Sequence, residues 1–308
     1  MSGSPSPTLP ENGGSPVPGI LAFEWRAFAL RTALRCLPAI CMTLAAGLVT
    51  GHPAAGMIAA GGAVSAGFGA FQQIGGSGTA PVFLAAMGMG ICTLVGGIAG
   101  SSALALALVA ALGGFLCGLL MAAGASASWV CRQSIIALLV ISAYPANMAV
   151  TTERASLILA GGLLQTLCFL VLRRAVPVRA LAALPAAFAP TRFLPVMRVL
   201  KESLSLRTEV FHYGLRLAVT LGITAGIARH VSLDHGYWVP MTALLVLKPD
   251  FHQTLARVTM RIAGTLVGAA LATLIAALMR PQPVVLALLV AVFATLCYCL
   301  LHVNYAAY

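Results

Sequence analysis

Residues 235–251, HGYWVPMTALLVLKPDF, hold an apolar run of ten residues, 238–247, between polar ends. Ten helical residues extend about 15 Å at 1.5 Å per residue, which is about half of a ~30 Å bilayer core. A plain helix over this run is therefore too short to cross a membrane, and Pro240 removes a backbone donor within its first turn. We predict a short, interrupted segment here, of the kind that transporters use to hold a charged ligand near the bilayer midplane.

The whole chain is too apolar to be a soluble protein. Of its 308 residues 60% are hydrophobic and 8% are charged, and its mean hydropathy is +0.98. This composition leaves too little polar surface to coat a soluble globule. The 18 Lys and Arg, against 7 Asp and Glu, lie beside apolar segments and form no dense patch with interleaved aromatic residues. We interpret them as the positive charge of cytoplasmic loops, not as a nucleic-acid interface.

Apolar runs of spanning length follow one another along the chain. We expect transmembrane helices at about 34–50, 54–73, 80–99, 102–123, 128–149, 155–172, 211–229, 236–248, 255–279 and 283–303. The predicted fold class is therefore all-α, a polytopic transmembrane bundle of about ten spans.

Composition also divides the chain into domains. Residues 1–22 are rich in Ser, Pro and Gly and lack the regions of a signal peptide, so we predict a disordered cytoplasmic N-terminal tail. Residues 23–173 form the first transmembrane half with six helices, and residues 174–210 form a basic, proline-broken cytoplasmic linker. We expect residues 211–308 to form a second half of about four helices, which is either a truncated or a divergent short form of the six-helix first half. We expect the N-terminus to lie on the cytoplasmic side of the membrane.

The two halves carry similar residues in the same order. The matches are Arg35 with Arg216, Gly51-His52 with Asp234-His235, Phe68 with Phe251, and residues 93–96 with 265–268. Because each half begins on the same side of the membrane, we expect two parallel repeats of 6 + 4 helices, related by an axis along the membrane normal. The first copy is rich in Gly and Ala where the second is polar, which predicts tight helix packing in the first half.

Candidate site residues lie in and just after residues 235–251. Tyr237 and Trp238 are candidates for aromatic contact with a substrate, or they belong to an aromatic belt at the membrane interface. Lys248 is a candidate for holding an anionic substrate, or it is a lysine that reaches from the apolar layer to the interface. Asp250 is a titratable carboxylate and a candidate for proton coupling.

Three further cationic residues are candidates for a functional role. Arg257 and Arg261 lie four residues apart on one helical face, so both can point into a cytoplasmic vestibule that attracts organic anions; the alternative is ordinary anchoring on the cytoplasmic side. Arg132, with Gln133 beside it, lies inside the fifth apolar run, where a charge usually faces the interior of the bundle.

The segment GYWVPMTALLVLKPDFHQTLARVTMRIAGTLVGA, residues 236–269, resembles the signature region of the fusaric acid resistance and aromatic acid exporter (FUSC) family of bacterial inner-membrane proteins. The resemblance is specific over 214–308 and vaguer over 23–173. It implies a location in the inner (plasma) membrane of a bacterium and efflux of small organic anions, above all aromatic carboxylic acids. We expect the proton gradient to drive this efflux. It also implies a periplasmic adaptor protein and an outer-membrane channel as partners, and we expect a possible homo-oligomer. Family members commonly carry a sizeable soluble domain and two further spans, whereas the linker here has fewer than forty residues.

The sequence gives less support to other functional classes. There is no HExxH, no GxSxG and no pair of carboxylates on one transmembrane face, so we expect no enzyme. The eight cysteines show no ligand spacing, so we expect neither a metal nor a cofactor. A passive organic-anion channel and a non-transporting membrane scaffold or assembly protein remain alternatives. A channel would share the Arg-lined vestibule and be indifferent to Asp250→Asn.

Overall fold

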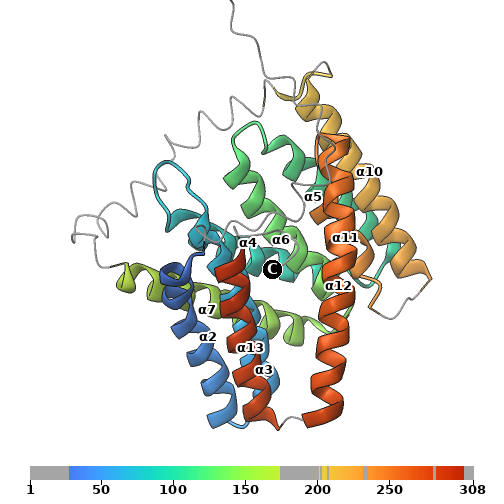
Figure 1. Ribbon diagram of the computed structural model, residues 1–308. Helices are drawn as coiled ribbons and strands as arrows, with labels where there is room; N and C mark the ends of the chain where they lie inside the picture. Colours follow the sequence, from blue (N-terminus) through green and yellow to red (C-terminus); the bar gives the residue numbers. More distant parts are fainter. Residues whose placement is uncertain are drawn as a thin grey trace, which may run out of the picture.

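The computed structural model describes residues 28–173, 201, 203–206, 208–231, 235–279 and 282–301, and these ranges contain helices and no strand (Figure 1). The helices are α2 (Leu30–Val49), α3 (Pro53–Gly67) with the 3-10 turn η2 (Phe68–Phe71), α4 (Ala80–Ala99), α5 (Ala103–Leu119), α6 (Ala125–Ser142), α7 (Met148–Leu172), α10 (Glu209–His230), α11 (Trp238–Val246), α12 (Phe251–Met279) and α13 (Pro283–Leu300). The predicted all-α fold is confirmed. The predicted tail, most of the predicted linker and the last seven residues lie outside the described ranges.

Eight of the described helices are long and apolar enough to cross a membrane. α5 is shorter, with 17 residues, and α11 has only nine. Every predicted apolar run therefore contains a helix, and the chain is a polytopic membrane protein. The run at 236–248 is the exception to the expected spans, because its helix is too short to cross a bilayer.

Glycine residues allow several of these helices to approach closely. A Cβ added at Gly161 of α7 would collide with the Ala59 backbone of α3, and one added at Gly118 of α5 would collide with Gly214 of α10. Lipid tails are as apolar as side chains, so helices in a membrane associate through close van der Waals packing instead of hydrophobic exclusion. The small residues of the first half therefore serve the tight packing that the sequence predicted.

Two helix pairs make the most extensive contacts between the predicted halves of the chain. α10 packs along α5, and α13 packs along α2. α2 and α10 are the first helices of their halves, whereas α5 and α13 are the fourth, so the two pairs are reciprocal. Figure 1 shows them on opposite sides of the bundle. Two parallel repeats related by an axis along the membrane normal would pack in this way, and the arrangement supports the predicted repeat.

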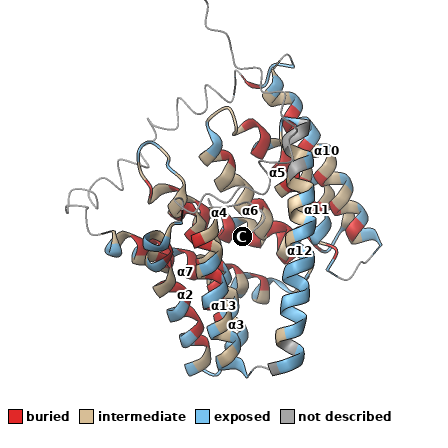
Figure 2. Ribbon diagram, in the orientation of Figure 1, coloured by how far each residue is buried: buried red, intermediate tan, exposed pale blue. Residues whose placement is uncertain are grey.

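α12 is exposed along most of its length. Its candidate spanning segment, Arg257–Ile275, contains no buried residue, and Figure 2 shows it in pale blue where most of the other helices carry buried stripes. α12 packs against α11, which precedes it in the chain. The tight turn between these two helices therefore sets where the first turns of α12 lie.

Candidate anion site

The local sequence explains why α11 is short. The helix follows a left-handed turn at His235, whose φ is 57°, and Pro240 lies in its first turn, where the missing backbone donor is tolerated. After Val246 the backbone becomes extended at Leu247, with ψ at 129°. Pro249 then disfavours helix in the residue before it. The predicted short, interrupted segment is confirmed.

Side chains of α10 hold the end of α11 in place. The Tyr213 hydroxyl donates a hydrogen bond to the Leu247 carbonyl at 3.1 Å, and Nη2 of Arg216 donates one to the Pro249 carbonyl at 3.0 Å. Carbonyl groups at and after a helix end have no partner within the helix, so these two bonds satisfy acceptors that would otherwise need water. The backbone on both sides of Lys248 is thereby fixed.

Thr254 of α12 closes the same turn from the other side. The backbone N–H of Lys248 donates to Oγ1 of Thr254 at 3.0 Å, and this hydroxyl donates to the Asp250 carbonyl at 3.0 Å. The Lys-Pro-Asp turn is therefore tied to the helices before and after it, which positions the Lys248 side chain.

A cavity of about 660 Å³ lies beside this turn, and we name it the basic cavity. Four cationic side chains line it: Arg132 of α6, Lys248, and Arg257 and Arg261 of α12. Its other lining residues are Ser65, Phe68, Gln72, Met121, Ala125, Trp129, Gln133, Ile136, Met241, Leu245 and Leu301. None of these described lining residues is acidic. Positive charge of one sign between low-dielectric walls attracts anions and raises their local concentration.

Arg132 offers a specific point of contact for an anion. It lies two turns into α6, and its Nε is buried with no hydrogen-bond partner among the described residues. A buried donor without a partner is costly, and a ligand oxygen or a water molecule in the basic cavity would satisfy it. The expectation that a charge at this depth faces the interior of the bundle is confirmed by its place in the cavity wall.

Lys248 lies outside the candidate membrane spans, and its surroundings in the basic cavity shift its pKa strongly. Burial, together with the positive charges of Arg132 and Arg257, lowers the pKa of Lys248 to about 7, with a smaller opposing effect from Cys117. A bound anion would stabilise the charged ammonium and raise this pKa again. Near or above neutral pH, Lys248 would therefore take up a proton when an anion binds.

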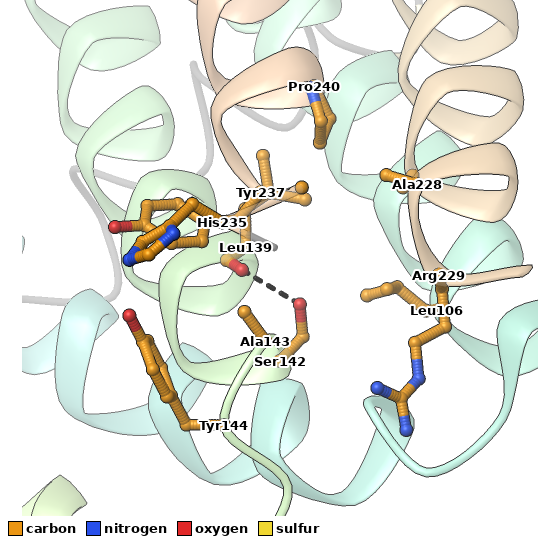
Figure 3. A pocket seen from close by; sticks show the side chains of 12 residues that line it. Leu106, Leu139, Ser142, Ala143, Tyr144, Ala228, Arg229, His235, Tyr237 and Pro240 are labelled. Carbon is orange, nitrogen blue, oxygen red and sulfur yellow. Dashed lines mark hydrogen bonds between the residues drawn. The ribbon is translucent and has the colours of Figure 1, made fainter. Parts of the chain in front are cut away.

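A second cavity, of about 280 Å³, lies at the other end of α11, and we name it the aromatic cavity. Figure 3 shows Tyr144, His235 and Tyr237 on one side of it and Arg229 on the other. The ring centroids of Tyr144 and Tyr237 are 6.1 Å apart, and those of His235 and Tyr237 are 6.3 Å apart. The cluster joins the loop after α6 to the start of α11.

The structure divides the six predicted site residues into separate places. Lys248, Arg257 and Arg261 line the basic cavity together, as the spacing of the two arginines suggested. Tyr237 lines the aromatic cavity at the opposite end of α11, and Trp238, which is 45% exposed, lines neither cavity. The two aromatic candidates therefore do not meet the three cationic ones.

The structure gives two further findings about the basic cavity that were not predicted from the sequence. Asp250 is exposed and is not among the described residues that line it. The aromatic rings in its wall come from the first half, from Phe68 and Trp129. Both lie more than a hundred residues from Lys248, and only the fold brings them to it.

Comparison with known proteins finds one matching family model and several curated relatives. Residues 223–308 match the model of a family described as "Fusaric acid resistance protein-like". "Uncharacterized protein ORF2" of Neisseria gonorrhoeae is 31% identical over 90 residues, which are 29% of this chain and 22% of that protein. "Inner membrane protein YccS" of Escherichia coli is 34% identical over 64 residues, 21% of this chain and 9% of that protein.

A third relative, "Uncharacterized protein slr1298" of Synechocystis, is 34% identical over 77 residues, which are 25% of this chain and 10% of that protein. The chain thus spans between about a tenth and about a fifth of the length of these three relatives. No solved structure matches it significantly. Across the described residues there is also no group of three or more His, Cys, Asp or Glu that could hold a metal ion.

Proposed function

We propose that the chain is an inner-membrane efflux transporter of small organic anions, with aromatic carboxylic acids as its substrates; the match of residues 223–308 to the model described as "Fusaric acid resistance protein-like" supports this proposal. The observation that carries the proposal is the basic cavity. Four cationic side chains and two aromatic rings, brought from both halves of the chain, line one space there.

The chemistry of this cavity suits a carboxylate attached to a ring. An arginine guanidinium can bind a carboxylate through two parallel N–H···O bonds, and Arg132, Arg257 and Arg261 each carry this group. Phe68 and Trp129 supply ring faces and edges for an aromatic substrate. The volume of about 660 Å³ also lies within the roughly 300–1,000 Å³ range of small-molecule sites.

Orientation and partners follow from the same proposal. The basic cavity lies beside the starts of α6 and α12, which the distribution of cationic loops assigns to the cytoplasm together with the N-terminus. The cavity would therefore gather substrate from the cytoplasm. A periplasmic adaptor protein, an outer-membrane channel and a homo-oligomer belong to the proposal as the partners that the family resemblance implies.

Proton coupling is the second part of the proposal. Asp250 remains the residue proposed for it from the sequence. Lys248 is a further candidate, because it lies in the cavity and its pKa of about 7 lets an arriving anion draw a proton onto it. Either Asp250 or Lys248 would couple the transport of an anion to the transport of a proton.

The test is uptake of labelled 4-hydroxybenzoate into inverted inner-membrane vesicles that contain the full chain, with and without an imposed proton gradient. We expect gradient-driven accumulation, loss of most of it in Arg132→Gln, and little change in the control Arg31→Gln, an exposed arginine of α2 that lines neither cavity. Asp250→Asn and Lys248→Met then show which group carries the coupling. Equilibration without accumulation would identify a passive channel, and uptake no greater than in empty vesicles would reject a self-sufficient transporter.

A further inference from the structure

A third cavity, of about 360 Å³, lies between α3, α4, α6 and α7 in the first half, and we name it the apolar cavity. It shares Ser65, Gln133 and Ile136 with the basic cavity, so the two spaces adjoin each other along one face of α6. It also shares Tyr144 with the aromatic cavity at the far end of that helix. The three cavities therefore form a row from the start of α6 to the loop after it.

The walls of the apolar cavity differ from those of its neighbours. They consist mostly of aliphatic side chains and glycine, including Ile58, Met89, Val140 and Ile158. The volume of about 360 Å³ is more than twice the ~150 Å³ of an apolar protein cavity that holds benzene. A single substituted aromatic ring therefore fits there, and the walls offer it apolar contact.

The space is a local feature of closely packed helices. A Cβ added at Gly62 would collide with the backbone of Ile158, and one added at Gly161 would collide with Ala59. A Cβ added at Gly61, which lines the cavity, meets no atom within 4 Å. α3 and α7 are thus in tight contact beside the cavity, and Gly61 leaves its own side open.

Polar groups lie at both ends of the apolar cavity. Ser65 and Gln133 lie at the end shared with the basic cavity, and Gln133 directly follows Arg132 in the sequence. At the other end Arg154 of α7 lines the cavity and donates a hydrogen bond from Nη1 to the Tyr144 carbonyl at 2.7 Å. A carboxylate leaving the cations of the basic cavity would therefore meet another arginine at the opposite end of the apolar cavity.

We propose that the apolar cavity is a binding site for the ring of an aromatic carboxylate on its way from the basic cavity to Arg154. The substrate route then runs through the first half, along α6, and the cations of the second half serve its entrance. The inference rests on the proposed function for the identity of the substrate. It adds the requirement that the anion carry an apolar ring.

The experiment uses Gly61→Cys in the full chain, with the rate of N-ethylmaleimide labelling at residue 61 read by mass spectrometry. The open space at Gly61 accepts a thiol without a collision. We expect benzoate to slow this labelling at least fivefold and acetate, which lacks the ring, to leave it unchanged. Ser101→Cys, at an exposed position outside the three cavities, is the matched control and should label at the same rate with either acid.

A second arm separates this inference from the proposed function. Gly61→Phe should fill the cavity and reduce 4-hydroxybenzoate uptake at least tenfold, whereas Leu112→Phe on an exposed face of α5 should not. If the wild-type chain transports the acid while benzoate leaves residue 61 unprotected, the route is wrong and the proposed function stands. If benzoate protects residue 61 but the vesicles accumulate nothing, the ring site stands and the transporter does not. Equal protection by acetate would reject the requirement for a ring.

Discussion

The hydroxyl of Tyr298 donates a hydrogen bond to the carbonyl oxygen of Val64 at 2.7 Å, across 234 residues of sequence. The bond joins α13 to α3, and the Tyr298 ring also lies edge-on to Phe68, with 4.7 Å between their centroids. Phe68 belongs to the wall of the basic cavity. The last described helix of the chain therefore supports a wall of the cavity from behind.

Removing the Tyr298 contacts should destabilise the protein in two distinguishable steps. Tyr298→Phe loses only the hydrogen bond, which should cost about 0.5–1.5 kcal/mol. Tyr298→Ala also empties a fully buried ring site, which should cost about 3–5 kcal/mol. Thermal unfolding of the purified protein in detergent measures both effects, with Phe293→Ala on the exposed side of α13 as the control. Equal melting temperatures for wild type and Tyr298→Ala would show that α13 does not pack on α3.

The contact between α5 and α10 depends on Gly118. Alanine favours a helix interior by about 1 kcal/mol over glycine, so Gly268→Ala, where a Cβ meets no atom within 4 Å, should be neutral or stabilising. Gly118→Ala should instead lower the melting temperature, because its Cβ would collide with Gly214 and separating the helices costs about 1–3 kcal/mol. Similar melting temperatures for the two variants would contradict this close helix crossing.

The helices could be predicted from the sequence because each apolar run is a local property. Length and hydropathy locate α2 and α13 without reference to the rest of the chain, and Pro240 with Pro249 marks the short α11 between its polar ends. The packing of α13 on α2 and of α10 on α5 is not local. It depends on which small residues face each other across the bundle, and the sequence alone does not state this.

The same distinction separates the predicted from the unpredicted parts of the site. Arg257 and Arg261 could be assigned to one cavity because residues four apart in a helix lie on the same face. Phe68 and Trp129 could not, because they come from different helices of the other half. The Gly- and Ala-rich sequence of the first half predicted only tight helix packing, because glycine carries no functional group. The structure shows in addition that Gly61 borders an open space.

Thr254 should act on the site by positioning Lys248. Thr254→Val removes the hydroxyl that accepts from the Lys248 N–H and donates to the Asp250 carbonyl, so the turn should loosen and benzoate affinity should fall several-fold. Thr254→Ser keeps the hydroxyl and should restore affinity. Both variants should melt near the wild-type temperature, since Thr254 is only half-buried. A Val variant that binds benzoate normally would show that the turn needs no side-chain support.

The pH dependence of anion binding should follow the charge of Lys248. Because burial and the neighbouring arginines lower its pKa to about 7, the ammonium is charged below pH 7 and mostly neutral above it. Benzoate itself, with a carboxyl pKa of about 4, stays ionised from pH 6 to 8.5, so changes in its affinity report on the protein. Affinity should fall roughly three- to tenfold as pH rises through 7, equivalent to about 0.6–1.4 kcal/mol.

Two variants and one calorimetric measurement make this pH prediction decisive. Lys248→Arg keeps the charge at every pH in the range, so it should bind tightly throughout, whereas Lys248→Met should bind weakly throughout. Titration calorimetry in two buffers of different ionisation enthalpy at pH 8 should also show wild type taking up a few tenths of a proton with each benzoate and Lys248→Arg taking up none. The direction follows from linkage, because an anion that favours the charged lysine must raise its pKa. A wild-type affinity that rises with pH, or proton release on binding, would remove Lys248 from the site and leave Asp250 as the candidate for coupling.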